Sequence, residues 1–415
     1  MKIIFIENTC EYDRLLHLAK TNKFLLFPLF NDDSHPIKSE PIVVFAKPLD
    51  LNELFVIGIS HSELINLPFP FEQFDAPFIY NKKYWSLPNS TDVETLYYAQ
   101  NLEYTIDLFK SQEDWRTYPI YKIVDGLLPA LTDFSETCKK SVMGKDIKFI
   151  NDITIPTLAQ IESYGIKVDS TFEPQSLVKD GFVYSQYNHL TTTGRPSNRY
   201  GGVNFSALNK SDGSRNPFVS RFDDGMLFML DYDSYHIRLI AKLIDYALPQ
   251  ESVHAYFAKQ YFNTDTITEE QYEKSKQISF QMMYGGILPE YEHITFFRSI
   301  QFLIDELWDA HQQTGYVPSV ISGIKINADS RTKLFNYVIQ NYETEQNMLV
   351  LRKILLETSK FESVPILYTY DSVLFDVKES ETETYLNKVR QIMELNGQFP
   401  VKTSYGKNYG EMIKL

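Results

Sequence analysis

The sequence predicts an α+β fold in which a small α/β unit precedes a larger unit made of an antiparallel sheet and helices. In the first part of the chain, apolar strand-like runs alternate with polar loops. In the second part, single buried strands alternate with amphipathic helices. The stretch ILYTYDSVLFDV at residues 366–377 has two apolar runs that meet at Asp371 and Ser372, which predicts a tight hairpin between two strands.

The composition is that of an ordered protein without a disulfide framework. At 415 residues the chain is long enough for two to three domains. A hydrophobic content of 43% excludes a disordered chain, and two cysteines favour a reducing, cytoplasmic setting. Acidic residues follow the first short apolar run, and no run approaches the roughly 18 apolar residues of a membrane span, so we expect neither a signal peptide nor a membrane partner.

The elements of the first part follow from local patterns. Strands are expected at 23–30, 41–46 and 54–60, and a helix near 90–109. A further helix is expected from Pro156 to Tyr164, because proline is typical of the first helical turn and Gly165 of the helix end.

In the second part, a segment without periodicity at 181–222 precedes a buried strand and a series of helices. Thr268 and Gln271 form a capping-box pattern that predicts the start of the helix that ends at Tyr284. The remaining predicted elements are a strand at 225–235, a helix at 235–247, a strand pair at 315–326, a long helix at 330–359, a helix at 382–396 and a short terminal strand.

Two aspartates stand at the ends of buried strands. Asp231 ends the apolar run MLFMLD, and Asp371 lies in the turn of the predicted hairpin. Carboxylates in such places are unfavourable unless they are paired or bind a cation, and oxygen ligands suit Mg²⁺. The alternative is that each aspartate is only a helix cap or a turn residue.

A third feature lies on the predicted helix at 268–284. Lys276, Phe280 and Tyr284 are spaced by four residues and therefore share one helix face. A cation in line with two aromatic rings suits a nucleoside triphosphate. The alternative is a stripe that packs in the core, with Lys276 in solvent.

In this order, the segments resemble the family A (Pol I-like) DNA polymerases. DYDSYHIRLIAKL resembles motif A, with Asp231 and Arg238; KSKQISFQMMYGG resembles motif B; and YTYDSVLFDV resembles motif C, with Asp371. LTTTGRPSNRYGGVNFS is similar to the Thr-Gly-Arg segment, and FNYVIQ to the helix that touches template and primer. The resemblance covers about residues 150–415 and extends to the segments at 153–169 and 315–326.

The resemblance implies a palm-and-fingers fold that performs two-metal phosphoryl transfer from dNTPs to the primer of a primer-template DNA. The implied domains are an exonuclease-like domain at 1–125, a helical connector at 126–170, a palm at 171–244 and 329–415, and fingers at 245–328. Asp231 and Asp371, with the backbone carbonyl of Tyr232, would bind two Mg²⁺ ions, with Mn²⁺ as an alternative. The implied nucleotide-binding residues are Lys276, Phe280, Tyr284, His236 and Lys274. The implied DNA-binding residues are Arg195, Asn336, Gln340, Arg238 and Arg199.

Three positions depart from the family pattern. Tyr272 stands where the family has a phosphate-binding Arg, for which Lys274 or Lys259 is the candidate substitute. His236 replaces the motif A Glu that excludes the ribose 2′-hydroxyl, and Ser372 replaces the Glu of motif C. Together, His236 and Ser372 leave RNA or primer synthesis open as an alternative activity.

A further departure is the short gap at 170–186, where the family carries a long helical thumb. We therefore expect a thumbless, phage-type enzyme that needs a partner protein to hold DNA, acting in the host cytoplasm. The formal net charge of −14 disfavours broad nonspecific DNA binding, although one segment concentrates basic residues that suit a local groove. These residues are Arg195, Arg199, Lys210, Arg215 and Arg221.

The N-terminal part lacks the Asp-x-Glu that the family's exonuclease carries on its first strand. Only Asp32 and Asp33 follow this strand, with Asp75 and Asp92 in later segments. We interpret the domain as a degenerate exonuclease with a structural or docking role; proofreading is the alternative. For the whole chain, the alternative to an active polymerase is a catalytically weak relic that serves as a DNA-binding or scaffold subunit.

Overall fold

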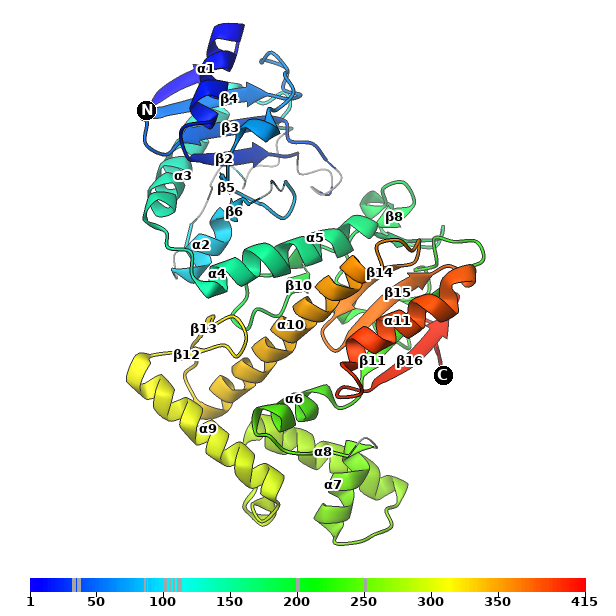
Figure 1. The fold of residues 1–415 in the computed structure, drawn as a ribbon. Helices are drawn as coiled ribbons and strands as arrows, with labels where there is room; N and C mark the ends of the chain where they lie inside the picture. Colours follow the sequence, from blue (N-terminus) through cyan, green and yellow to red (C-terminus); the bar gives the residue numbers. More distant parts are fainter. Residues whose placement is uncertain are drawn as a thin grey trace. The chain divides into compact units, whose positions relative to one another are not determined.

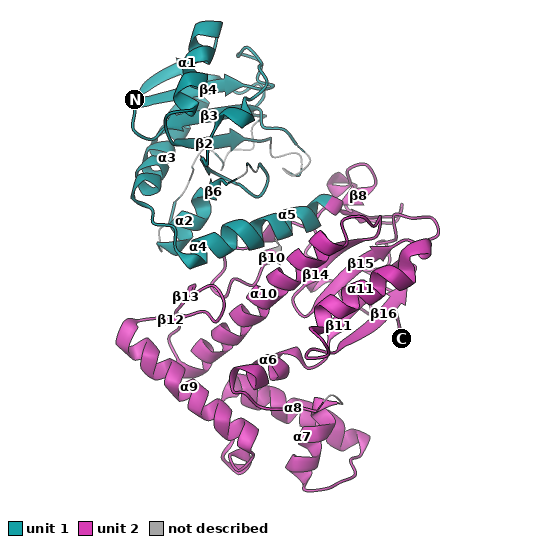
Figure 2. Cartoon of the chain, in the orientation of Figure 1, with its two compact units in different colours: residues 1–163 teal, residues 164–415 magenta. Residues whose placement is uncertain are grey.

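The structure is a computed structural model of the chain. It describes residues 1–415 except 32–34, 36–38, 86, 88, 101–102, 105, 107–108, 110–113, 199–201 and 250–251. The chain divides into two compact units, unit 1 at Met1–Ser163 and unit 2 at Tyr164–Leu415 (Figure 2).

Unit 1 is built on a mixed sheet with the strand order β1-β4-β3-β2-β5-β6 (Figure 1). β2, β3 and β4 pair in an antiparallel manner, whereas β5 and β6 run parallel to β2, and β1 runs parallel to β4. The strands are β1 (Lys2–Phe5), β2 (Phe24–Leu29), β3 (Val43–Pro48), β4 (Glu53–Gly58), β5 (Phe78–Ile79) and β6 (Thr91–Asp92).

Helices cover both faces of this sheet. Alternate residues of a strand point to opposite faces, and in β2 Phe24 and Leu26 pack with Leu15 of α1, whereas Leu25 and Phe27 pack with α2 and α3. The helices are α1 (Thr9–Ala19), α2 (Val93–Ala99), α3 (Ile120–Lys140), α4 (Lys145–Phe149) and α5 (Ile155–Tyr164), with a π-helical stretch at Ile150–Thr154 between the last two.

Unit 2 contains an antiparallel sheet with the strand order β14-β15-β11-β16-β17. Its strands are β11 (Met226–Tyr232), β14 (Val364–Thr369), β15 (Ser372–Val377), β16 (Val401–Gly406) and β17 (Ile413–Lys414). The smaller strand pairs of the unit are β7 (Ile166–Lys167) with β8 (Phe182–Val183), β9 (Tyr187–Asn188) with β10 (Ser197–Asn198), and β12 (Val317–Pro318) with β13 (Lys325–Ile326).

Helices make up most of the rest of unit 2. They are α6 (Tyr235–Leu243), α7 (Val253–Phe262), α8 (Glu269–Gly285), α9 (Thr295–Thr314), α10 (Arg331–Glu357) and α11 (Thr382–Glu394). One apolar cluster, which includes Ile240, Phe257, Met282, Ile300 and Phe335, joins α6–α10 into a single core. Figure 1 shows that the long helix α10 extends from this helical group to the sheet.

The patterned elements of the sequence form close to the predicted residues. The capping box of Thr268 and Gln271 begins α8, and α5, α6, α10 and α11 occupy their expected segments. The hairpin turn differs by one residue from the prediction, because Thr369 pairs with Ser372 and the turn therefore consists of Tyr370 and Asp371. The helix expected at 90–109 is short: α2 ends at Ala99, and part of the remainder lies outside the described residues.

Four helices of ten or more residues, α1, α3, α7 and α9, were not predicted from the sequence. α1 buries only Leu15 and Ala19, which leaves a thin apolar stripe. α3 contains Pro129, a residue that normally argues against a helix interior. α9 did carry a signal, since Phe296, Phe297, Ile300 and Ile304 are buried at helical spacing. None of the helices in the described ranges is long and apolar enough to span a membrane.

Candidate active site

Asp231 lies near the end of β11, in the middle of the unit 2 sheet. Hydrogen bonding on both sides fixes this strand: Asp231 is opposite Ser372 of β15 and opposite Lys402 of β16. Its predecessor Leu230 points to the other sheet face, so the strand directs the carboxylate away from α11.

Asp371 lies in the turn between β14 and β15, next to Asp231. The N–H group of Tyr232 donates a hydrogen bond of 2.9 Å to the carbonyl of Asp371. The other turn residue, Tyr370, has a left-handed φ of 64°, a conformation that costs a non-glycine residue about 1–2 kcal/mol. A group on α10 supports this turn, because Asn347 Nδ2 donates to the Tyr370 carbonyl at 2.7 Å.

The pKa values of both carboxylates are raised, and the charge of Asp371 contributes to the shift of Asp231. Burial, followed by the charge of Asp371, raises the pKa of Asp231 to about 6. Asp371 opens to solvent on one side, and its partial desolvation, followed by the charge of Glu343, raises its pKa. Among the described residues, no hydrogen bond to the Asp231 carboxylate and no ion pair of either carboxylate is found, and the hydrogen bond that acts on the Asp371 carboxylate comes from its own backbone N–H. Two carboxylates in this state favour a cation between them.

The donor set suits Mg²⁺ if other ligands complete its shell. No group of three or more His, Cys, Asp or Glu side chains within the described ranges is placed to hold a metal ion. Mg²⁺ is ordinarily held by one or two carboxylates, with waters and substrate phosphates as the other ligands. Asp231 and Asp371, with the nearby backbone of Tyr232, therefore fit a magnesium site that is completed by substrate.

The predicted face of α8 forms a stripe beside the sheet. The rings of Phe280 and Tyr284 stack with their centroids 6.0 Å apart, and Phe280 is 51% exposed. Lys276 lies over the ring of Tyr272 at 4.4 Å and forms an ion pair of 2.6 Å with Glu273. The positively charged group of this face is thus near the surface and engaged with a neighbouring carboxylate.

Lys274 does not belong to this face. Residues two positions apart on a helix point in different directions, so Lys274 lies off the row of Lys276 and Phe280. It is exposed to solvent. Lys274 therefore lies off the helix row that contains Tyr272, and its role as a substitute for the missing Arg stays a prediction.

His254 was not identified from the sequence, although the structure brings it to the α8 face. It lies at the start of α7, is 8% exposed, and packs edge-on against Tyr272 with the centroids 6.2 Å apart. Its Nδ1 atom has no hydrogen-bond partner in the described structure. Burial lowers the pKa of His254, and the charges of Asp233 and Lys276 are close enough to act on it. A single histidine in a helix gives no pattern that a sequence search would detect.

His236, at the start of α6, contacts the end of α8. Its Nδ1 atom is hydrogen-bonded to the hydroxyl group of Tyr284. Burial, followed by the charge of Glu343, raises the pKa of Tyr284 to about 12. The two residues that were predicted to shape the nucleotide pocket therefore touch each other.

The residues predicted to contact DNA lie on different elements of unit 2. Arg195 lies in a loop with its guanidinium 3.8 Å above the ring of Tyr370, next to Asp371. Asn336 and Gln340 share one face of α10, and Asn336 Nδ2 donates to the Tyr284 carbonyl at 3.3 Å. Arg199 lies outside the described residues.

Arg238 is placed differently from the prediction. It is 6% exposed, and its guanidinium donates to the carbonyl groups of Asp233 and Pro249. A buried side chain of this kind stabilises the connection between β11 and α6. In this structure the guanidinium is engaged within unit 2, and a DNA contact by Arg238 stays a prediction.

The basic segment that suggested a groove is partly used inside the protein. Arg221 forms an ion pair of 2.9 Å with the fully buried Asp376. Arg215 donates to the Leu208 carbonyl and lies 4.5 Å from the ring centroid of Tyr409. These two guanidinium groups stabilise the fold and are not free to form a basic groove.

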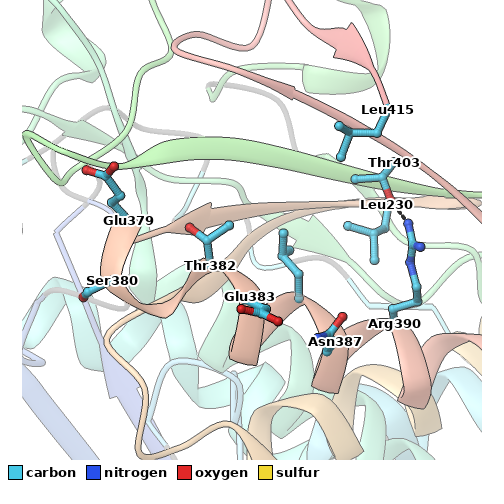
Figure 3. Close-up of a pocket in the computed structure, with 10 residues that line it drawn as sticks. Leu230, Glu379, Ser380, Thr382, Glu383, Asn387, Arg390, Thr403 and Leu415 are labelled. Atoms are coloured by element: carbon cyan, nitrogen blue, oxygen red, sulfur yellow. Dashed lines mark hydrogen bonds between the residues drawn. The ribbon is translucent and has the colours of Figure 1, made fainter.

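A pocket of about 470 Å³ lies on the other face of the sheet (Figure 3). Leu230 and Thr403 of the sheet line it together with residues of α11, and Arg390 donates to the hydroxyl of Thr403. Since Leu230 and Asp231 point to opposite faces, this pocket is separate from the two carboxylates.

The acidic residues of unit 1 form no comparable site among the described residues. Asp92 is 1% exposed and caps α2, where it accepts hydrogen bonds from the N–H groups of Thr95 and Lys82. Asp75 is exposed, and Asp32 and Asp33 lie outside the described residues. Asp92 therefore has the bonding of a structural residue.

Comparison with known proteins supports the fold. No family model matches the chain. Among solved structures, the chain is similar to the POL domain of Pol1 from M. smegmatis, determined in complex with DNA primer-template and dNTP. The TM-score is 0.77 at 15% sequence identity, and the match covers 99% of this chain and 99% of that chain. The prediction of an α+β polymerase fold is thereby confirmed.

Proposed function

We propose that the chain is a template-directed DNA polymerase of the family A type, which adds dNTPs to the 3′ end of a primer. The observation that carries the proposal is the pair Asp231 and Asp371, fixed side by side by the sheet register. Two neighbouring negative charges are unfavourable without a cation between them. Phosphoryl transfer needs a bound metal cation. The similarity to the fold of a DNA polymerase domain supports the same proposal.

The proposed metal ligands are Asp231, Asp371 and the backbone carbonyl of Tyr232, for two Mg²⁺ ions or alternatively Mn²⁺. When bound, the ions would supply activation of the primer 3′-hydroxyl and charge neutralisation of the triphosphate. The protein's own task is to hold the carboxylates still. The two-sided pairing of β11 fixes Asp231, and the hydrogen bond from Asn347 fixes the turn that carries Asp371.

The face of α8 is proposed to bind the nucleotide, with Lys276 on the phosphates and Phe280 and Tyr284 beside the base. Lys276 would exchange Glu273 for a phosphate. An exposed ion pair contributes about 0.2–1 kcal/mol, whereas a hydrogen bond to a charged group contributes about 1.5–3 kcal/mol. The exchange is therefore favourable. His254, with its free Nδ1 beside Tyr272, is added to the proposed phosphate side.

The proposed DNA contacts are Arg195, Asn336 and Gln340, with Arg199 retained from the sequence. The proposed domains keep the predicted limits: an exonuclease-like domain at 1–125, a connector at 126–170, a palm at 171–244 and 329–415, and fingers at 245–328. We also propose that the enzyme is thumbless and phage-type, and that a partner protein supplies the missing grip on DNA. The N-terminal domain is proposed to have a structural or docking role.

Primer extension tests the proposal. The full-length protein is incubated with a labelled primer-template, Mg²⁺ and either dNTPs or NTPs. We expect template-directed extension with dNTPs that is lost when a chelator removes the metal. Absence of extension with Mg²⁺ and with Mn²⁺, also in the presence of replication proteins, would overturn it. Equal use of NTPs would instead indicate RNA or primer synthesis, the activity that His236 and Ser372 leave open.

A catalytically weak polymerase that serves as a DNA-binding or scaffold subunit is the second candidate. The observation that favours it is the state of Lys276, which lies beside Tyr272 and is paired with Glu273. Tight binding of primer-template without any extension would support this candidate over the first.

A further inference from the structure

Glu343 is a buried carboxylate in the middle of α10 that none of the proposed roles uses. Its side chain is 1% exposed, and glutamates are almost never so buried unless they are paired. Its Oε2 atom accepts no hydrogen bond from any described residue. The packing of α10 therefore does not explain why an ionisable side chain lies at this position.

Two side chains from distant parts of unit 2 flank this carboxylate. Arg195 Nη2 lies 3.3 Å from Oε2, and His236 Nε2 lies 3.2 Å from Oε1. Neither contact has the alignment of a hydrogen bond, and Arg195 Nε and His236 Nε2 also have no hydrogen-bond partner among the described residues. Glu343 therefore stands between a loop residue and a residue of α6, with bonding capacity left on all three.

Each of these neighbours touches a different part of the candidate site. Arg195 covers the ring of Tyr370, the residue before Asp371. His236 is hydrogen-bonded to Tyr284 at the end of α8. The Glu343 carboxylate thus contacts Arg195, which is proposed to bind DNA, and His236, which is bonded to the nucleotide-side residue Tyr284.

Glu345, two residues further along α10, shows what a structural carboxylate looks like in this protein. It is 2% exposed, nearly as buried as Glu343. Its oxygens accept hydrogen bonds from the hydroxyl groups of Ser319 and Ser322 and from the N–H groups of Ile321 and Ser322. Glu345 therefore anchors the loop between β12 and β13, and its bonding capacity is used within the fold.

We propose that Glu343 is a positioning residue shared by the DNA side and the nucleotide side of the site. It holds Arg195 over Tyr370, and it holds His236 against Tyr284, so that both are in place before substrate binds. The inference rests on the proposed polymerase function and adds to it a residue that neither the motifs nor their spacing indicated. Because Arg195 and His236 are both positioned by the Glu343 carboxylate, the binding of DNA and the binding of dNTP are coupled through it.

The test uses full-length protein, a dideoxy-terminated primer-template and the matching dNTP with Mg²⁺, so that binding is measured without chemistry. Glu343→Gln keeps the shape of the side chain and removes its charge. We expect the Kd for primer-template and the Kd for dNTP each to rise by about tenfold, which lies toward the lower end of the range for a buried polar group that loses its partner. Glu345→Gln is the matched control and is expected to lower the melting temperature while leaving both constants within about twofold of wild type.

Single substitutions on each side separate the two contacts. His236→Gln is expected to weaken dNTP binding only, and Arg195→Gln to weaken primer-template binding only. Adding Glu343→Gln to His236→Gln should then change the dNTP constant little further, because residues that act together are not additive. Glu343→Asp, which keeps the charge on a shorter side chain, is expected to restore part of both affinities.

The outcomes of these experiments separate failure of the Glu343 inference from failure of the polymerase proposal. If Glu343→Gln leaves both constants within twofold of wild type, or if Glu345→Gln raises them equally, Glu343 is a fold-stabilising residue only and the inference is wrong. If wild type binds both ligands without extending a normal primer, the polymerase proposal fails while the binding test of Glu343 stands. If wild type binds neither ligand, both proposals are wrong.

Discussion

The central strands of the two units differ in one residue type, because only the strand of unit 2 carries an aspartate near its end. β2 of unit 1, FLLFPL, is fully buried and carries no polar side chain. β11 of unit 2, MLFMLDY, is just as apolar until Asp231. Both strands lie inside their sheets between hydrogen-bonded neighbours. A carboxylate at such a place is unfavourable unless it is paired, as Asp376 of β15 is with Arg221, or binds a cation.

The carboxylates near the two sheets also differ in their bonding. Asp92 of unit 1 accepts hydrogen bonds from N–H groups and from the hydroxyl of Thr95. Among the described residues, the Asp231 carboxylate of unit 2 has no such hydrogen bond, and the Asp371 carboxylate has one from its own backbone N–H. A buried carboxylate that is fully bonded stabilises a fold, whereas a pair that is left largely unbonded is available to a ligand. This difference supports the proposal that unit 2 carries the catalytic site and that unit 1 has a structural role.

The largest expected effect comes from the pair itself. Asp231→Asn and Asp371→Asn each remove one negative charge with little change in volume. We expect each to lower the rate of single-turnover primer extension by at least about 10³-fold, the upper range for removal of one group that stabilises transition-state charge. Asp92→Asn is the control from unit 1, and its extension rate is expected to equal that of wild type. A slow Asp92→Asn variant would contradict the proposal that Asp92 is a structural residue and that the catalytic carboxylates lie in unit 2.

The second effect concerns the α8 face. Lys276→Ala is expected to raise the KM for dNTP by about 10- to 100-fold, since it removes a charge-assisted contact to phosphate. The rate at saturating dNTP should fall much less. Lys274→Ala, on the same helix but off this face, is the matched control and should change neither constant. Equal effects of the two substitutions would show that general positive charge, not the stripe, binds the nucleotide.

The third effect is a pH dependence confined to unit 1. Burial, followed by the charge of Glu94, raises the pKa of Asp92 to about 7, above the value of about 3.9 for an unfolded chain. The folded state therefore binds the proton more tightly, and its stability falls as pH rises through 7. Between about pH 6 and 8 the expected loss is about 1 kcal/mol in the free energy of unfolding.

Tryptophan fluorescence measures this loss in the full chain. Trp85 and Trp115 are buried in unit 1, and a Trp308→Phe background leaves them as the reporters. Asp92→Asn in the same background should give a nearly flat dependence of stability on pH, although Lys82 and Glu94 remain beside the site. A dependence that persists in Asp92→Asn would assign it to one of these two groups.

The sequence predicted those parts of the molecule in which one local pattern has one physical meaning. The capping box at Thr268, the apolar run before Asp231 and the four-residue spacing from Lys276 to Tyr284 each led to the observed element. Side chains whose neighbours come from distant segments were not predictable. Glu343 meets Arg195 and His236 only because three elements converge, and no spacing along the chain encodes that.

Two of the predicted site residues have side chains that point away from the face on which they were expected, for similar reasons. Arg238 was predicted to contact DNA because it belongs to a motif, yet the helix α6 turns it toward the carbonyls of Asp233 and Pro249. Lys274 was chosen for its charge alone, and the helical period places it off the row of Lys276. In both cases the residue type suits the predicted role, but the side chain points away from the expected partner.

The smallest expected effect concerns the ion pair between Lys276 and Glu273. If Lys276 must exchange Glu273 for phosphate, then Glu273→Gln removes a competitor, and the KM for dNTP should fall. The pair is partly exposed, and exposed pairs contribute about 0.2–1 kcal/mol, so the expected decrease is at most about fivefold. Salt screens such a pair, and the difference between variant and wild type should therefore shrink as ionic strength rises. Glu270→Gln, in the first turn of the same helix, is the control for a general loss of negative charge. An increase in KM in Glu273→Gln would mean that Glu273 holds Lys276 in its working position, and the site would then be preformed on the α8 side as it is on the sheet side.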